Sequence, residues 1–205
     1  MVAKGNAGEA NLRYTLTMTA LPTPQPFPLL TSEEFLDWEI RQEDRHEFIN
    51  GQIVAMAGNS EGHHVIAINT ALALRARIPK PCRATTERMV KIPNKNWRFA
   101  DVLVDCSGFD PKAWYAGEPR IAVEVESPST SYFEEMERLE DYQCVPSIAH
   151  VLILAQDRPR ARLYTRTETG WIASDYTKLE QTVALASLGV ELPLAELYEG
   201  FGFTA

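Results

Sequence analysis

A chain of 205 residues with 45% hydrophobic and 23% charged residues is long enough to form one globular domain with its own core, which excludes a disordered protein. No apolar run reaches the ~18–20 residues that a transmembrane helix needs, and the first residues lack the apolar centre of a signal peptide, so we expect a cytoplasmic protein without a membrane partner. The net charge of −8 counts against a nucleic-acid-binding surface that covers the whole protein.

Residues 1–30 have the composition of a Pro-rich flexible leader, and residues 31–205 that of the folded domain. Prolines occupy every second position from Pro22 to Pro28, which removes backbone donors and favours an extended, polyproline-like chain. Directly after them, Thr31-Ser-Glu-Glu34 has the pattern of a capping box, so we predict a short helix that runs to about Arg41.

The next segment, from His46 to Met56, has the pattern of a β-hairpin. Asn50-Gly51 supplies the two residues with positive φ that a type I′ turn needs, which is the strongest short-range signal for a hairpin. A second helix is predicted from about Ser60 to Ile78, where Pro79 and Pro81 end it. Its apolar residues recur at helical spacing: Val65, Ile68 and Leu72.

The rest of the chain is predicted to alternate between strands and helices. Ser131-Tyr-Phe-Glu134 is a second capping box, which begins a helix that continues to about Gln143. A closing helix is predicted near 193–198. This order, without an internal repeat, predicts an α/β domain with a mixed sheet. Strands are predicted at roughly 83–92, 99–105, 120–126, 148–155 and 160–166, with an edge strand at about 171–176.

Two acids, Asp101 and Glu124, lie in neighbouring predicted strands that otherwise have the composition of buried strands. The two-residue period of a strand places Asp105 on the same face as Asp101, and Glu126 on the same face as Glu124. If the strands pair with Asp101 near Glu124, their carboxylates supply the oxygen ligands that Mg²⁺ prefers. The alternative is an antiparallel pair with one solvated face, on which acids are ordinary.

Two further charged residues could join these acids. Glu47 precedes the tight turn of the predicted hairpin, where it could anchor a metal ion or position water, or could be an ordinary exposed acid. Arg138 follows on the helix after Glu124 and supplies a cation behind the carboxylates. Two carboxylates from adjacent strands with a cation behind them are the layout expected for metal-assisted phosphodiester chemistry.

Basic residues are concentrated between Arg75 and Arg98. This segment holds eight basic residues and one acid, Glu87, which gives +7 locally and leaves −15 for the rest of the chain. Such segregation allows a local phosphate-contacting patch on an acidic protein, and a solvated strand and loop is the alternative. The residues we predict to contact nucleic acid are Arg75, Arg88, Lys91 and Arg98.

The cysteines and histidines do not have the spacing of a zinc site. Cys82, Cys106 and Cys144 are odd in number and form no CxxC, so each is predicted to be a small core residue rather than half of a disulfide. His63 and His64 are adjacent, so on a helix they point about 100° apart, and a polar or helix-capping role is expected for them.

Taken together, these segments resemble a large bacterial family of restriction-endonuclease-like proteins within the PD-(D/E)XK nuclease superfamily. The resemblance covers roughly residues 31–200, and its most specific part is the block Val-Glu-Val-x-Ser-Pro-Ser-Thr. It rests on His46-Glu-Phe-Ile-Asn-Gly-Gln-Ile, Met56-Ala-Gly before His63, Phe99-Ala-Asp-Val, Val123-Glu-Val-Glu-Ser-Pro-Ser-Thr130, Tyr142 and Pro146-Ser-Ile.

This resemblance implies a restriction-endonuclease-like core, in which a mixed central β-sheet is flanked by helices. It also implies a site built from Glu47, Asp101 and Glu124 that binds Mg²⁺ or Mn²⁺ as its cofactor. Similar proteins often form homodimers, and the activity implied for them is the cleavage of DNA.

The chain departs from the family pattern at three positions. Ala100 replaces the proline that usually precedes the first acid, and Glu126 stands where the wider superfamily has a lysine. Arg138 replaces the lysine that family members tend to carry on the following helix. An arginine can clamp a phosphate in a bidentate way, but it cannot act as a general base. Glu126 adds a negative charge near Glu124, which would raise one pKa unless a cation compensates.

Three functions are compatible with these residues. The first is a metal-dependent endonuclease in which Asp101 and Glu124 bind the ion, Glu47 supports it and Arg138 stabilises the transition state. The second is a catalytically impaired module that binds nucleic acid or protein without cleavage, for which the changes at Glu126 and Arg138 would be the cause. The third is a structural or oligomeric protein with an acidic surface.

Overall fold

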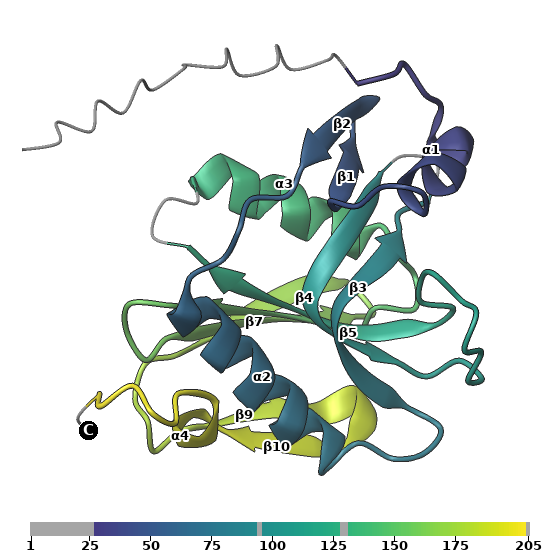
Figure 1. Cartoon of the computed structure of the whole chain (residues 1–205). Helices are drawn as coiled ribbons and strands as arrows, with labels where there is room; N and C mark the ends of the chain where they lie inside the picture. The colour runs from purple at the N-terminus through teal and green to yellow at the C-terminus, as the bar shows by residue number, and fades with distance from the viewer. Residues whose placement is uncertain (1–26, 94–95, 128–130, 204–205) are drawn as a thin grey trace, which may run out of the picture.

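A computed structural model describes residues 27–93, 96–127 and 131–203 (Figure 1). The predicted leader therefore lies outside the described residues, except for 27–30. None of the helices in these ranges is both long and apolar enough to cross a membrane. The elements are α1 (Ser32–Glu39), β1 (His46–Ile49), β2 (Gln52–Ala55), α2 (Glu61–Arg75), β3 (Arg83–Lys91), β4 (Trp97–Asp105), β5 (Pro119–Glu126), α3 (Tyr132–Gln143), β6 (His150–Ala155), β7 (Ala161–Thr167), β8 (Gly170–Tyr176), β9 (Thr182–Leu185), η1 (Ala186–Leu188), β10 (Val190–Pro193) and α4 (Leu194–Leu197).

A mixed sheet runs through the centre of the domain, as the sequence predicts. Its strands lie in the order β2-β1-β4-β5-β6-β7-β8, and β3 also pairs with β4. β5 and β6 are parallel, because α3 connects them across one face, and the other described pairs of this sheet are antiparallel. β9 and β10 form a separate small sheet that the sequence analysis misses, since each has only four residues.

Alternate residues of the central strands pack into different cores on the two faces of the sheet. On one face Val102 and Val123 pack with side chains of α2, β9, β10 and α4. On the opposite face Leu103 packs with the apolar side chains of α3. Figure 1 shows α3 on one side of the sheet and α2 with the small sheet on the other. Asp101 and Glu124 alternate with Val102 and Val123, so they belong to the face that α3 covers rather than to a solvated one.

The capping boxes and the hairpin turn have the structures that the sequence predicts. Thr31 and Ser131 are the N-caps of α1 and α3, and each completes a capping box with the glutamate three residues later. The turn of the β1–β2 hairpin has positive φ at Asn50 (50°) and Gly51 (84°), as a type I′ turn requires. These elements place the hairpin and α3 on either side of the candidate acids.

The apolar stripe of α2 does not mark its buried face. Ile68 and Leu72 are 53% and 61% exposed, whereas Ile66 and Leu74 are fully buried. Ala67 and Ala73 share the buried face and allow the helix to approach the sheet closely. Two apolar stripes are present in this helix, and spacing alone does not show which one faces the core.

The prediction that no cysteine is half of a disulfide is wrong, although Cys82 and Cys106 do pack against the core. Cys82 and Cys106 form a disulfide, and Cys144 is exposed at the end of α3. Arg83 is paired with Asp105 in the β3–β4 ladder, so the residues just outside this pair face each other across the two strands. The register of these strands cannot be read from cysteine spacing, which explains the error.

Candidate active site

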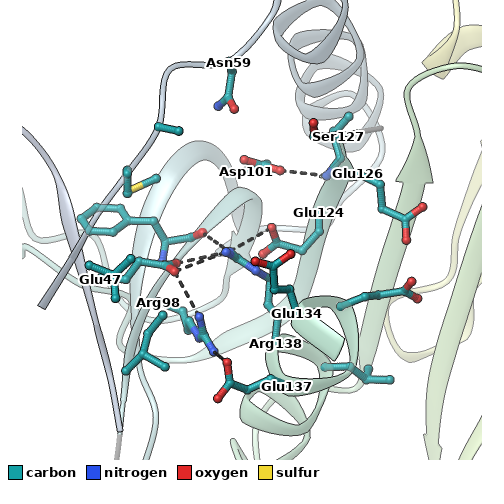
Figure 2. Close-up of a pocket in the computed structure, with 18 of the residues that line it drawn as sticks. Glu47, Asn59, Arg98, Asp101, Glu124, Glu126, Ser127, Glu134, Glu137 and Arg138 are labelled. Carbon is teal, nitrogen blue, oxygen red and sulfur yellow. Dashed lines mark hydrogen bonds and ion pairs between the residues drawn. The ribbon is translucent and has the colours of Figure 1, made fainter. Parts of the chain in front are cut away.

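A pocket of about 800 Å³ lies among the β1–β2 hairpin, the start of α2, the strands β4 and β5, and α3 (Figure 2). It brings together the four residues predicted to be catalytic, although they come from four separate elements. Acids outnumber arginines on its wall, so the pocket is strongly negative. The charged residues that line it are Glu47, Arg98, Asp101, Glu124, Glu126, Glu134, Glu135, Glu137 and Arg138.

Asp101 lies in the middle of β4, where the β4–β5 ladder ends and the β3–β4 ladder is interrupted. The β4–β5 ladder ends at the pair of Val102 and Val123, so Asp101, the residue that precedes Val102, has no ladder partner in β5. The β3–β4 ladder skips Asp101 as well, at Glu87, whose φ of 48° is left-handed. The side chain fills part of this gap, because Asp101 Oδ2 accepts a hydrogen bond of 2.8 Å from the N–H of Val125. The separation of the strands leaves the carboxylate open to the pocket.

Glu124 is buried beneath α3 and has few donors. The hydroxyl of Tyr142 donates to its Oε1, and Arg138 Nη1 lies 3.3 Å from its Oε2. Burial raises the pKa of Glu124 to about 8, and the charges of Asp101 and Glu47 act in the same direction, against Arg138 and Tyr142. An additional cation would stabilise the ionised form of this carboxyl group.

Glu47 and Arg138 form an ion pair across the pocket. Arg138 donates to both carboxylate oxygens of Glu47 at 3.2 Å, and its Nη1 is shared with Glu124. Glu47 also accepts the N–H of Phe99 at 2.9 Å and Arg98 Nη1 at 3.1 Å. Arg138 therefore bridges two of the predicted acids (Figure 2), and Glu47 already has its own cationic partners.

The predicted phosphate contact at Arg98 is wrong, because this side chain is only 3% exposed. Its guanidinium group contacts Glu47 at 3.1 Å and Asp141 at 2.7 Å. Asn96 donates to both carboxylate oxygens of Asp141 from the other side. A buried arginine with buried acid partners supports the site from beneath and does not reach a substrate in solvent.

The other predicted phosphate contacts lie away from the pocket. Arg75 is exposed at the end of α2, and Lys91 lies 5.3 Å from the ring centroid of Trp97. Arg88 donates to the carbonyl groups of Ala113 and Tyr115 at 2.8 Å each. The described lining of the pocket includes none of these three basic residues. Their contact with nucleic acid stays a prediction.

Glu126 does not leave an isolated charge beside Glu124. Burial and a hydrogen bond shared with Glu135 raise the pKa of Glu126 to about 7, while Arg160 and Arg158 oppose the shift. Arg160 Nη1 lies 3.8 Å from Glu126 Oε2. A raised pKa favours the uncharged form of Glu126, so the charge repulsion expected from the sequence is reduced.

His63 is a pocket residue that the sequence analysis places only in a polar or capping role. Its Nε2 lies 3.1 Å from Asp101 Oδ2, and the side chain is nine-tenths buried. Its Nδ1 is buried and has no hydrogen-bond partner among the described residues. The signal that could identify it is its position in the first turn of α2, which enters the site beside Asp101.

Asp101 and Glu124 fit a hard divalent cation. They present carboxylate oxygens from two neighbouring strands, and burial, with the nearby charge of Asp101, raises the pKa of Glu124 against the effect of Arg138. Mg²⁺ usually takes only one or two carboxylates, and water and substrate phosphate complete its coordination. Within the described part of the chain, no group of three or more His, Cys, Asp or Glu side chains is spaced as a metal site. Glu47 could join the pair only by exchanging its arginine contacts.

Comparisons with known proteins agree with the motifs of the sequence. The family model described as "Uma2: Putative restriction endonuclease" matches residues 32–195. A curated relative, "Uncharacterized protein slr1290" of Synechocystis sp., is 30% identical over 191 residues, which cover 91% of this chain and 100% of the relative. A second Synechocystis protein, "Uncharacterized protein sll1609", is 23% identical over 72% of this chain and 87% of its own length.

A solved structure has the same fold. It is described as a putative nuclease belonging to DUF820 from Anabaena variabilis, and it matches with a TM-score of 0.66 at 17% sequence identity. The match covers 82% of this chain and 97% of the other. The mixed sheet flanked by helices is therefore shared with that protein, as the sequence predicts.

Proposed function

Because the chain belongs to the Uma2 family, described as putative restriction endonucleases, we propose that it is a metal-dependent endonuclease that hydrolyses DNA phosphodiester bonds. One observation carries this proposal. Asp101 and Glu124 come from strands that separate at this point, and Arg138 faces Glu124 across the pocket. A buried, negative pocket of this kind is unfavourable without a function that uses the charge.

In the proposed site, Asp101 and Glu124 would hold Mg²⁺ or Mn²⁺. When bound, such an ion supplies an activated water and neutralises charge that develops on the scissile phosphate. The buried setting of Glu124 strengthens its attraction for a cation, since water screens the interaction poorly there. The strand positions of both acids keep their backbones fixed while substrate enters.

Arg138 and Glu47 have a supporting role in this proposal. Arg138 is 31% exposed at its side chain, so part of the guanidinium group can reach a phosphate from the pocket side. Its bond to Glu47 fixes its direction, and Glu47 is itself held by Arg98 and by the N–H of Phe99. Arg138 cannot accept a proton, so it contributes charge and orientation only.

The family and the chemistry of the pocket support DNA as the partner. A polyanion can approach so many acids only if cations intervene, which Arg138 and a divalent ion would provide. The exposed Arg75 and the basic side chains of Arg88 and Lys91 are proposed to contact phosphates farther from the cut. Homodimer formation and a cytoplasmic location, which the sequence analysis expects, belong to the same proposal.

A second function is favoured by one observation. Arg138 already balances Glu47 and Glu124 through paired hydrogen bonds, so the acids have a counter-charge in the protein itself. A module of this kind would bind nucleic acid or protein without cleavage. It would retain DNA in the presence of a chelator, and rising salt would weaken that binding.

Cleavage of DNA by the purified protein separates the two functions. Supercoiled plasmid and single-stranded DNA are incubated with Mg²⁺, with Mn²⁺ or with a chelator, using the wild-type chain and Asp101→Asn. We expect nicking by the wild-type chain with either ion, and none with the chelator or with the variant. Equal nicking by both proteins would indicate a contaminating nuclease, and DNA retention without any cleavage would support the binding module instead.

A further inference from the structure

We infer that His63 is a positioning residue of this site, which holds the carboxylate of Asp101 in the direction needed to share a cation with Glu124. This inference rests on the proposed function. The ring nitrogen Nε2 of His63 lies 3.1 Å from Asp101 Oδ2. An ionised carboxylate only accepts hydrogen bonds, so the hydrogen of this contact belongs to Nε2.

The hydrogen bonds that the described residues make to the carboxylate of Asp101 are all on one oxygen. Oδ2 accepts the N–H of Val125 at 2.8 Å and the N–H of His63 at 3.1 Å. No described residue donates a hydrogen bond to Oδ1, so no such bond competes with a ligand of that oxygen. Two donors on Oδ2 fix the plane of the carboxylate, which leaves Oδ1 as the oxygen available to a cation beside Glu124.

His63 is itself held firmly by the first turn of α2. Its backbone N–H donates to the hydroxyl of Ser60, the N-cap of the helix, and Gln156 donates to the same hydroxyl. Gly62 packs so closely that a Cβ atom there would lie 3.1 Å from Gln156 Nε2 and 3.4 Å from the ring of Phe201. The helix start therefore cannot shift easily, so the imidazole has a fixed position next to the strand gap at Asp101.

The hydrogen-bond partners of the two ring nitrogens distinguish His63 from His150, a structural histidine. His150 is also buried, and both of its ring nitrogens have partners: Thr165 Oγ1 at Nδ1 and the N–H of Ser187 at Nε2. His63 has Asp101 on one nitrogen, and Nδ1 has no partner among the described residues. A buried polar atom without a partner is unusual and calls for an explanation. Among the described residues the imidazole therefore has a single hydrogen-bond partner, Asp101, which points to a role toward that carboxylate.

Two variants of His63 test the inference, because asparagine and glutamine carry the same amide group at different distances from the backbone. Glutamine places its NH₂ group about as far from the backbone as Nε2, whereas the shorter asparagine reaches only to the position of Nδ1. His63→Asn should therefore lose the bond to Asp101, while His63→Gln keeps it. His64→Gln is the matched control, since His64 is the exposed neighbour on the same helix.

Mn²⁺ affinity is measured by calorimetry, and kcat and KM by plasmid cleavage. We expect His63→Asn to weaken Mn²⁺ binding about 10- to 100-fold and to lower kcat, as the loss of a hydrogen-bond partner of a metal ligand does. His63→Gln and His64→Gln should bind Mn²⁺ as the wild-type chain does. Equal losses in His63→Asn and His63→Gln, or full affinity in His63→Asn, would overturn the inference.

The wild-type chain provides a check that does not depend on folding of a variant. Nitrogen-15 NMR of the imidazole should show the hydrogen of His63 on Nε2, and a hydrogen on Nδ1 alone would refute the positioning role. If the wild-type chain binds Mn²⁺ and cleaves DNA while the variants behave alike, only this inference fails. If the wild-type chain neither binds the ion nor cleaves, the proposed function fails first.

Discussion

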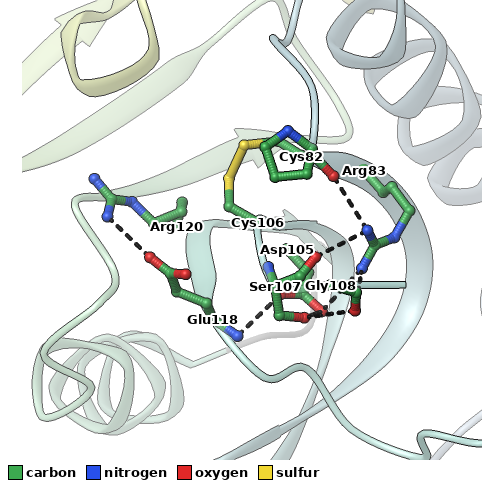
Figure 3. The surroundings of a disulfide bond; sticks show 9 residues. Cys82, Arg83, Asp105, Cys106, Ser107, Gly108, Glu118 and Arg120 are labelled. Carbon is green, nitrogen blue, oxygen red and sulfur yellow. Dashed lines mark hydrogen bonds and ion pairs between the residues drawn. A yellow bond between two sulfur atoms is a disulfide. The ribbon is translucent and has the colours of Figure 1, made fainter. Parts of the chain in front are cut away.

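The middle and the end of β4 place acids in opposite electrostatic settings. In the middle of the strand Asp101 lies beside Glu124 of β5, where burial raises the pKa of Glu124 to about 8 (Figure 2). At the end of the strand Asp105 is buried like Glu124, and burial alone would raise its pKa. Hydrogen bonds from the backbone of Ser107 and Glu118 outweigh burial, so the pKa of Asp105 is lowered (Figure 3).

The loop after β4 supplies the donors that Asp105 needs. Oδ1 accepts the N–H groups of Ser107 at 3.0 Å and Glu118 at 2.9 Å. Oδ2 accepts the hydroxyl of Ser107 and the N–H of Gly117. A Cβ atom at Gly117 would lie 2.9 Å from the Cβ of Ser107, so this close approach requires glycine. Burial alone thus does not mark a functional acid, and the supply of donors distinguishes a structural acid from one suited to a cation.

The largest expected effect is the difference in cleavage between two variants that each neutralise one acid, Glu124→Gln in the pocket and Asp105→Asn at the end of β4. Glu124→Gln should reduce Mn²⁺-dependent cleavage by more than about 100-fold, since even the outer partners of metal ligands contribute roughly 10- to 100-fold. Its unfolding midpoint without metal should not fall, because an uncharged side chain of the same shape removes the cost of burying a charge. Asp105→Asn should cleave normally once its lower stability is allowed for. Plasmid cleavage and urea unfolding of both variants measure the contrast, and loss of cleavage in Asp105→Asn alone would reverse it.

The alternation of strand residues gave the face of each acid within its own strand, and the family motifs singled out Asp101 and Glu124 among many acids. The pairing of distant residues was not accessible in this way. Arg98 is buried because Asp141 and Glu47 surround it, and neither is near it in the sequence. A basic residue within a basic segment gives no sign of such partners, so the patch prediction failed there.

Register and strand separation account for the remaining differences. The contact between His63 and Asp101 forms where the ladders of β4 with β3 and β5 are interrupted, which depends on tertiary structure. The disulfide depends on the β3–β4 register in the same way. Residues that act within one element were predictable, and residues that act between elements were predictable only where the family resemblance identified them.

The disulfide provides the second contrast, since it lies at the Asp105 end of β4 (Figure 3). Cys82 and Cys106 are 24 residues apart, and their disulfide limits the conformational entropy of the unfolded chain. Replacing both with serine should therefore lower the free energy of unfolding by about 3 kcal/mol. Cleavage at temperatures where the protein is folded should remain, because neither cysteine of the disulfide lines the pocket. Denaturant unfolding measures the difference. Cys144→Ser is the matched control, and a thiol reagent that labels three cysteines in the unreduced protein would contradict the disulfide.

The acid response of the Asp105 end is the third test. Because the folded pKa of Asp105 is lowered, its stabilising contribution is present above the unfolded pKa of about 3.9 and is lost as pH falls through the folded value. Asp105→Asn should cost about 2 kcal/mol at pH 7, since charge-assisted hydrogen bonds are lost. The difference between the two proteins should shrink on acidification below about pH 4. Urea unfolding at several pH values measures it, and a difference that stays constant with pH would exclude Asp105 as the titrating group.

The smallest expected effect concerns the cation that compensates the pocket. Arg138→Lys restores the residue that similar proteins tend to carry, so cleavage should be retained or increased. The free energy of unfolding should nevertheless fall by about 1 kcal/mol, because lysine cannot donate to both oxygens of Glu47 as the guanidinium group does.

Arg162→Lys is the matched control, since Arg162 forms a similar two-point contact with Asp175 in an exposed position, where the change should cost less. Equal costs at the two positions would mean that burial adds nothing to the Arg138 contact, and loss of cleavage in Arg138→Lys would mean that the guanidinium group itself is needed for the reaction.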